Sequence, residues 1–329
     1  MKYDLENINA RFGIGSQKWQ EMKNNPLVDE KVIPFSVADM EFKLAPEITE
    51  GLKKFIDDNI LGYAGTNKKY RENVCKWQQK HHDFTVDEKW LVETHSVVNA
   101  FFTAVKAFTQ KGDGVMLFTP VYYPMYKAIE INQRKLVEIP LINNGMTYDI
   151  DWDLFTKKAK AIDTKMLILC SPHNPCGRIW TREELTKISE ICLANDILVV
   201  ADEIHADLIM PGFKHVSYGT ISKEALEHSI ICTAPSKTFN LAGMQLSNVF
   251  IANENYRNLF KAEQATDADF ACSILSYEAC RLAYEYGEEW LTEVINIIDT
   301  NKKNNYGFYA RVFSTSENNT ASSDIFIMA

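Results

Sequence analysis

The sequence contains no apolar run that approaches the roughly 18 residues needed to span a membrane. Basic residues are also in the minority, because 35 lysines and arginines stand against 44 aspartates and glutamates, for a formal charge of −9. Nucleic acid backbones select basic surfaces, so this balance speaks against them. We therefore expect no membrane and no nucleic acid among the partners, and small molecules as ligands.

Cysteine is scarce, with seven residues in 329, and no spacing among them is typical of a metal site. Most lie in apolar segments such as 166–170 and 229–233, which suits buried, reduced thiols. Cys176 lies in a predicted site loop, where packing is still its more ordinary role. Residues 1–13 are charged and lack the apolar core of a signal peptide, so the sequence predicts a cytoplasmic protein.

Hydrophobic residues make up 46% of the chain and aromatic residues 12%, which is enough for a full α/β core. The length favours one large domain and a smaller one. We expect residues 1–45 to form an N-terminal arm and part of the small domain, and 46–285 to form the large domain. Residues 286–329 would then supply a connecting helix and the rest of the small domain.

The middle of the chain alternates between apolar runs of strand length and helical patterns, which predicts a mainly parallel sheet between helices. The runs are 115–118, 165–170, 197–201 and 229–233. Between the second and third runs, Thr181 and Glu184 have the spacing of a helix capping box. A strand, a helix and a strand in this order predict a right-handed parallel crossover.

Polar or aromatic segments follow all four predicted strands, at 119–123, 171–175, 202–205 and 234–237. The carboxyl ends of parallel strands meet at one edge of a sheet, where ligands bind in open α/β folds. The sequence therefore predicts that these segments converge.

Two charged residues in these segments have unusual settings. Asp202 follows five apolar residues, so its carboxylate is costly unless a cation pairs with it, although an isolated aspartate is as often a cap. Lys237 follows an apolar strand, where poor solvation lowers a lysine pKa and favours Schiff base formation. A lysine taken alone is far more often a surface residue, and only its position changes that prediction.

A lysine that forms a Schiff base and a carboxylate that pairs with a cation are two parts of a pyridoxal 5'-phosphate (PLP) site. The other parts, namely a phosphate site, a ring to stack on the cofactor and a donor to its ring oxygen, have candidates as well. Ser96 precedes an apolar-faced helix predicted to end at Gly112, and the first amides of that helix, at Val97 and Val98, can hold a phosphate. Tyr122 is a candidate to stack on the cofactor ring and Tyr123 to face the substrate, although adjacent tyrosines are usually packing residues. Asn174, between two prolines, suits a positioned donor but is also an ordinary turn residue.

Three motifs in this order and spacing resemble the PLP-dependent class I/II aminotransferase superfamily of fold type I. They are Ser171 to Arg178 (SPHNPCGR), Ala201 to His205 (ADEIH) and Ser236 to Asn240 (SKTFN). The segments 38–42 (ADMEF), 61–63 (LGY) and 119–124 (TPVYYP) further resemble its cystathionine β-lyase branch, the C-S lyases. The resemblance covers roughly residues 1–312 and implies a PLP-dependent transferase-like α/β fold.

The resemblance also implies roles for single residues. Lys237 would form the Schiff base and transfer the proton, Asp202 would pair with the pyridine nitrogen, Tyr122 would stack on the ring, and Asn174 and His205 would lie near the ring oxygen. Tyr63 would reach the phosphate of a partner subunit, which predicts a homodimer. The further candidates are Val97, Val98 and Ser236 for the phosphate, and Tyr123 near the leaving sulfur.

Two positions depart from the superfamily pattern and thin out the phosphate site. Gln245 stands where a phosphate-binding arginine is expected, and Ala234 stands where a serine is common. A hydrogen bond to a charged group contributes about 1.5 to 3 kcal/mol, so weaker but retained PLP binding is expected.

The C-terminal part departs from the pattern as well. The superfamily implies an arginine in a smaller α+β domain that grips the substrate carboxylate, whereas the last arginine here is Arg311, inside a predicted helix 289–313. Residues 325–328 are predicted to form one strand of an unfinished sheet. We expect the small domain to be C-terminally truncated.

Three functional hypotheses follow from the sequence. The first is a PLP-dependent C-S β-lyase that converts sulfur-containing L-amino acids to thiol, pyruvate and ammonia. The second is an aminotransferase on the same site, and the third is a PLP-binding regulatory protein with little turnover. Fold-level likeness does not choose between the first two, because function resides in the site.

Overall fold

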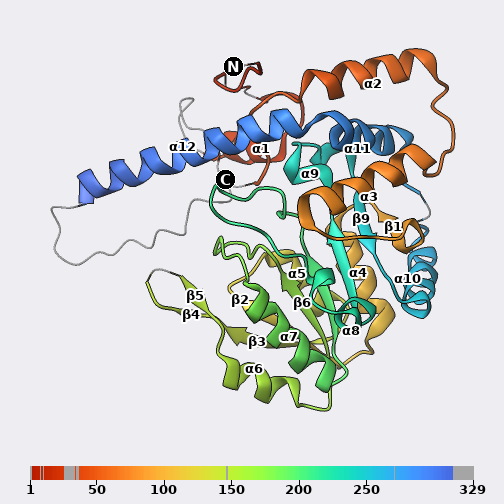
Figure 1. Cartoon of the computed structure of the whole chain (residues 1–329), viewed down its shortest axis with the longest axis vertical. Helices are drawn as coiled ribbons and strands as arrows, with labels where there is room; N and C mark the ends of the chain where they lie inside the picture. Colours follow the sequence, from red (N-terminus) through yellow and green to blue (C-terminus); the bar gives the residue numbers. More distant parts are fainter. Residues whose placement is uncertain are drawn as a thin grey trace.

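The computed structural model describes residues 2–7, 9, 11–25, 34, 37–145, 147–269 and 271–313. Its centre is a seven-stranded sheet of order β1-β9-β8-β7-β6-β2-β3 (Figure 1). The strands are β1 (Leu91–Thr94), β2 (Gly114–Thr119), β3 (Lys135–Pro140), β6 (Thr164–Cys170), β7 (Leu198–Asp202), β8 (Ser229–Thr233) and β9 (Ser247–Phe250). A separate hairpin joins β4 (Ile142–Asn143) and β5 (Tyr148–Asp149).

The four predicted strands correspond to β2, β6, β7 and β8, and they are parallel to one another, as expected. β9 alone among the seven runs antiparallel to its neighbours β8 and β1. Every residue of β2, β7 and β8 is buried. Strands covered on both faces read as continuous apolar runs, which explains why these three were recognisable from the sequence.

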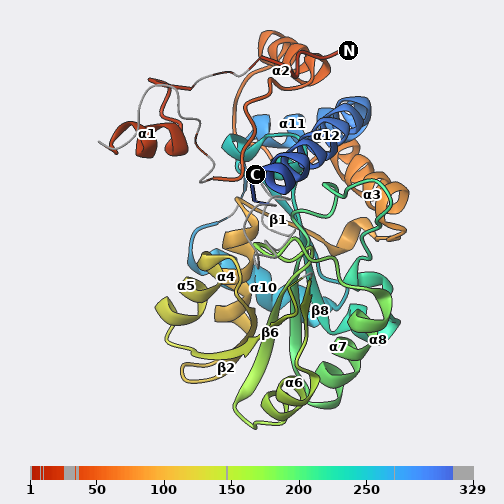
Figure 2. The same cartoon turned by 90° about the vertical axis from the view of Figure 1, so that its left-hand side faces the viewer.

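Helices cover both faces of the sheet and its carboxyl end. The helices of the described residues are α1 (Gln17–Lys23), α2 (Pro46–Asp58), α3 (Lys68–His82), α4 (Val97–Phe108), α5 (Tyr123–Ile131), α6 (Trp152–Ala159), α7 (Arg182–Ala194), α8 (Lys223–Glu227), α9 (Pro235–Thr238), α10 (Glu254–Thr266), α11 (Ile274–Tyr286) and α12 (Glu288–Phe313). Figure 2 shows α4, α5 and α10 on one side of the sheet and α6, α7 and α8 on the other. The core accordingly has two parts, and successive strand residues point into them alternately: Val115 and Leu117 into one, Met116 and Phe118 into the other.

Two helix ends were predicted from side chains, with different success. The capping box of α7 is present, because Thr181 accepts from the amide of Glu184 while the Glu184 carboxylate accepts from the amide of Thr181. The predicted end of α4 at Gly112 is wrong, since the helix stops at Phe108 and Thr109 is extended. The hydroxyl of Thr109 bonds back to the carbonyl of Val105, and Gly112 instead serves a turn with φ of +89°.

A second group of helices lies beyond the carboxyl end of the sheet. α11 packs against α2 and α3, and α12 follows it as one long helix, in agreement with the helix predicted over 289–313 (Figure 1). The predicted strand 325–328 lies outside the described residues, so the expected truncation and the domain boundaries stay predictions. Among the helices that the structure describes, none has the length and apolarity to cross a membrane.

Candidate functional site

Three of the predicted loop segments meet at the carboxyl edge of the sheet. Asp202, the last residue of β7, lies in register between Cys170 of β6 and Cys232 of β8. The Ser171 amide donates to the Asp202 carbonyl over 2.9 Å, which fixes the start of the loop after β6. The predicted convergence is therefore observed at these positions.

His173 joins the loop after β2 to the loop after β6. Its Nε2 donates to the carbonyl of Pro120 over 2.8 Å, and burial lowers the pKa of His173 to about 4. The imidazole is thus neutral near pH 7 and acts as a fixed link. Sequence reasoning assigned it no role, although a histidine between two strand-end prolines was visible in the motif.

Asp202 is a buried carboxylate without a cationic partner. The Ile204 amide donates to its Oδ1 over 3.1 Å, but within the described part of the chain no lysine, arginine or histidine forms an ion pair with it. Burial raises the pKa of Asp202 to about 7, against the lowering effects of the Ile204 hydrogen bond and the charge of Lys237. A cation bound beside Asp202 would therefore stabilise its carboxylate.

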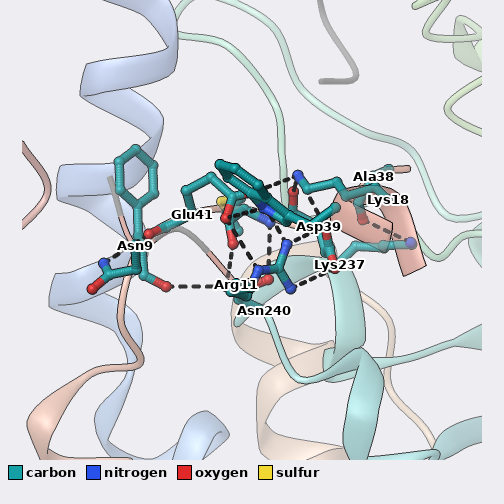
Figure 3. Close-up of polar contacts among 11 residues, drawn as sticks. Asn9, Arg11, Lys18, Ala38, Asp39, Glu41, Lys237 and Asn240 are labelled. Atoms are coloured by element: carbon teal, nitrogen blue, oxygen red, sulfur yellow. Dashed lines mark hydrogen bonds and ion pairs between the residues drawn. The ribbon is translucent and has the colours of Figure 1, made fainter. Parts of the chain in front are cut away.

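Lys237 lies in the short helix α9, one turn after the end of β8. Burial lowers the pKa of its amine, although the carboxylates of Asp39 and Asp202 act in the opposite direction. This direction agrees with the prediction from sequence. Its Nζ donates to the Ala38 carbonyl over 2.8 Å, so a segment from the far N-terminal part of the chain lies directly at the lysine (Figure 3).

His205 is the third ionisable residue at the centre of the site. It is 6% exposed, and its Nδ1 is buried with no hydrogen-bond partner among the residues described. Burial, with a contribution from the charge of Lys237, lowers the pKa of His205 to about 3. A neutral imidazole with an unsatisfied nitrogen next to Lys237 is an open position for a polar ligand atom.

The aromatic and amide candidates surround this centre. Tyr122 is half-buried at the start of α5, and burial together with the charges of Tyr123 and Asp202 raises its pKa. Tyr123 has its ring 5.4 Å from that of Tyr122 but is 61% exposed, on the outer side. Asn174 is half-buried, and its amide donates to the Cys170 sulfur over 3.3 Å.

The start of α4 lies at the same edge of the sheet. β1 ends at Thr94, which pairs with Ser247 of β9, and the next residue of β9, Asn248, pairs with Thr233 at the end of β8. Ser96 caps α4 by accepting from the Asn99 amide over 3.1 Å. The amides of Val97 and Val98 are the first of the helix and have no partner within it, which makes them anion donors.

The other phosphate candidates differ in their settings. Ser236 is half-buried in the first turn of α9, and Gln245 is exposed just before β9. Tyr63 does not join the group around Lys237: its side chain is fully exposed in the loop between α2 and α3. Its neighbours Leu61 to Ala64 line a groove together with 271–275.

A cluster of four charged side chains holds the N-terminal segment over Lys237, and sequence reasoning missed it (Figure 3). Arg11 binds Asp39 through two hydrogen bonds of 2.8 Å and also reaches Glu41. Lys18, with a side chain 5% exposed, forms ion pairs with the same two carboxylates. Asp39 and Glu41 are two residues apart, so in an extended segment their side chains face the same side. This spacing was the only feature of the sequence that could have indicated the cluster.

Asn240 fixes the same segment from below. Its Oδ1 accepts from the Met40 amide over 2.9 Å, and its Nδ2 donates to the carbonyls of Met40 and Phe42. Because Asn240 is three residues after Lys237, the lysine loop and the segment 38–42 are bound to one another. We call this arrangement of Arg11, Lys18, Asp39, Glu41 and Asn240 the N-terminal clasp.

We expect the N-terminal clasp to open in acid. Burial raises the pKa values of Asp39 and Glu41, but Arg11 and Lys18 outweigh it and the net values lie below the ordinary 3.8 and 4.5. Their stabilisation is therefore present above those ordinary values and is lost as pH falls through the lower folded ones. Trp19 reports the change, because its Nε1 donates to Glu41 over 3.1 Å.

The measurement is an acid titration of Trp19 fluorescence, obtained by subtracting the signal of the Trp19→Phe protein. Asp39→Asn, which removes one carboxylate of the clasp, should move the transition to higher pH. Identical transitions in the two proteins would contradict an ionic clasp.

Comparison with known proteins gives a consistent picture. A family model described as aminotransferase class I and II matches residues 30–276. Cystathionine beta-lyase PatB of Bacillus subtilis is 38% identical over 291 residues, which are 88% of this chain and 75% of that protein. Protein MalY of Escherichia coli is 26% identical over 291 residues, with 88% and 74% covered.

Solved structures show the same likeness. Cystalysin from Treponema denticola, whose crystal structure contains a pyridoxal 5'-phosphate cofactor, has a TM-score of 0.92 and 42% identity, covering 94% of this chain and 79% of that one. The PLP-bound C-S lyase from Staphylococcus hominis has a TM-score of 0.86 and 30% identity, covering 95% and 78%. The likeness thus extends over the sheet and over the strand-end loops that carry Asp202 and Lys237.

Proposed function

Because the chain belongs to the aminotransferase class I and II family, we propose that it is a PLP-dependent carbon–sulfur β-lyase. Its substrates are sulfur-containing L-amino acids, and its products are a thiol, pyruvate and ammonia. One observation carries the proposal: Asp202, a buried carboxylate that forms no ion pair with any residue the structure describes, shares a sheet edge with Lys237, a lysine of lowered pKa. The names of PatB and of the staphylococcal C-S lyase support the reaction type.

The residues present fit PLP. A pyridinium N–H beside Asp202 would supply the missing cation, and a ring oxygen would satisfy a buried donor such as His205 Nδ1 in its protonated tautomer. Tyr122 would cover the ring and Asn174 would donate at the oxygen side. The phosphate would take the amides of Val97 and Val98 and the hydroxyl of Ser236.

When bound, PLP supplies an electron sink for negative charge that develops at the substrate Cα. Asp202 would keep the pyridine nitrogen of bound PLP protonated. Lys237, with its amine pKa lowered by burial, would be the base for the Cα proton. Tyr123 assists the departing sulfur, and its exposure at the outer side of the site leaves room for varied leaving groups. Hydrolysis of the remaining three-carbon fragment gives pyruvate and ammonia.

The proposal includes a homodimer in the cytoplasm. Tyr63 is fully exposed, and the apolar residues Ile56, Ile60 and Leu61, within seven positions of it in the sequence, are also exposed. An exposed apolar patch of this kind marks an interface, and a second copy seated there would let Tyr63 reach the phosphate of its partner. Light scattering of the wild-type chain and of Tyr63→Phe separates assembly from phosphate binding, because only the hydroxyl is removed.

The decisive experiment uses L-cystathionine and L-cysteine with the purified, PLP-saturated chain. We expect pyruvate and ammonia in equal amounts, with no requirement for a keto acid. The thiol product, homocysteine or sulfide, should appear in the same ratio. Absence of pyruvate with both substrates, in protein that retains bound PLP, would overturn the lyase assignment.

An aminotransferase is the second candidate, favoured by the extent of the family match. The likeness of kynurenine–oxoglutarate transaminase 3 of Homo sapiens, 28% identical over 203 residues, points the same way but covers only 60% of this chain. This reaction consumes a keto acid and releases no ammonia. Turnover that depends on added 2-oxoglutarate would therefore select it.

A further inference from the structure

A buried ion pair lies one layer behind Lys237. Asp207, in the loop that follows β7, accepts hydrogen bonds from three residues. His82 Nε2 lies 2.7 Å from Oδ1, Trp77 Nε1 donates to the same oxygen over 3.0 Å, and Thr238 Oγ1 donates to Oδ2 over 2.7 Å. The side chains of His82 and Asp207 are only 5% and 8% exposed, so each charge depends on the other.

The two partners agree on their charge state. Burial lowers the pKa of His82, but the hydrogen bond to Asp207 and its charge outweigh burial and raise the net value. Burial raises the pKa of Asp207, but His82, Thr238 and Trp77 outweigh it and the net value is lowered. Both shifts favour an imidazolium facing a carboxylate. The other titratable groups that face it are His81, Asp83, Glu203, His215 and Tyr284.

The pair is connected to Lys237 through the next two residues of the chain. Thr238 donates to Asp207, and Phe239 packs edge-on against Trp77, with ring centroids 5.4 Å apart. α9 has only four residues, too few to hold its own shape, so these contacts with α3 and with the loop after β7 help to fix it. The same carboxylate anchors the loop after β7 two residues beyond His205.

We propose that the His82–Asp207 ion pair and the hydroxyl of Thr238 form a positioning device that sets the place of Lys237 relative to Asp202. All three are positioning residues, since they act through the backbone of α9 and of the loop after β7. The consequence for PLP chemistry rests on the proposed function. The placement of the lysine itself is independent of it.

Thr238→Val is the sharpest test, because it removes one hydroxyl, changes no charge and nearly keeps the volume. The charges that act on Lys237 are Asp39, Asp202 and Lys18, so a changed titration of Lys237 in this variant reports position. We would remove any bound PLP from the full chain, label its amines over a range of pH and follow the Lys237 peptide by mass spectrometry. We expect the labelling midpoint to move up, toward that of an exposed lysine.

A second readout is the rate at which the chain takes up PLP, which we expect to fall about tenfold in Thr238→Val. Thr238→Ser should restore both readouts, because it returns the donor to Asp207. Thr164→Val, at another buried threonine, is the matched control and should behave as wild type.

The outcomes separate the two proposals. A Thr238→Val protein that unfolds more readily but shows an unchanged Lys237 labelling curve would overturn the positioning role. Should that variant fold poorly, His82→Gln carries the same test, because it leaves Asp207 its other two donors. Labelling needs neither PLP nor substrate, so a chain that lacked lyase activity would still decide the matter.

Discussion

Lys237→Ala will abolish pyruvate formation while leaving the fold intact. The side chain is half-buried and donates only to the Ala38 carbonyl among the described partners, so its loss removes little packing. Proton transfer by a positioned base contributes roughly 10²- to 10⁴-fold to a rate, and loss of the covalent link to the cofactor adds to this. We expect activity below detection in a pyruvate assay.

The matched control is Lys53→Ala, at an exposed lysine of α2 that pairs with Glu50. Its activity should equal that of wild type. In Lys237→Ala the absorbance of covalently bound PLP should also vanish, whereas PLP held without the covalent bond would wash out on dialysis. Pyruvate release by Lys237→Ala at a tenth of the wild-type rate would show that another base serves the site.

The sequence predicted those strands and helix ends that residues close together in the chain determine. β2, β7 and β8 are buried on both faces, so they appear as apolar runs, and the α7 capping box needs only two side chains three positions apart. The convergence of Asp202 with its neighbours followed from the rule that parallel strands end at one edge. The end of α4 was misplaced because the prediction relied on a single glycine and did not consider the hydroxyl of Thr109.

The rest of the site depends on residues that meet only after packing. Arg11 reaches Asp39 across 28 positions, Asn240 holds Met40 across 200, and His82 meets Asp207 across 125. No periodicity or spacing links such pairs in one sequence. The burial of Asp202 was inferred from its strand, but that no described residue forms an ion pair with it could be seen only in the folded structure.

Asp202→Asn will raise the stability of the PLP-free chain and lower its affinity for PLP. Asparagine keeps the shape of the side chain and the hydrogen bond from Ile204, but it does not pair with a pyridinium. Loss of a hydrogen bond to a charged group costs about 1.5 to 3 kcal/mol, which corresponds to roughly a ten- to hundredfold weaker PLP affinity. Equilibrium dialysis against PLP measures this directly.

The stability effect has a defined sign and pH range. The pKa of Asp202 is about 7 in the folded PLP-free chain and 3.8 ordinarily, so between these values the folded state binds the extra proton. The free energy of unfolding therefore falls as pH rises from 3.8 to about 7, and stays low above that. Asp202→Asn lacks this loss, so at pH 8 its PLP-free form should melt at a higher temperature than wild type.

The order should reverse when PLP is bound. A ligand that binds only the folded state stabilises it in proportion to its affinity, so PLP will raise the melting temperature of wild type more than that of Asp202→Asn. Asp57→Asn, at an exposed carboxylate of α2, controls for the loss of one surface charge and should change neither form. If PLP-free Asp202→Asn melts below wild type at pH 8, the carboxylate is paired in the free protein. Asp202 would then give no support for a cationic cofactor bound beside it.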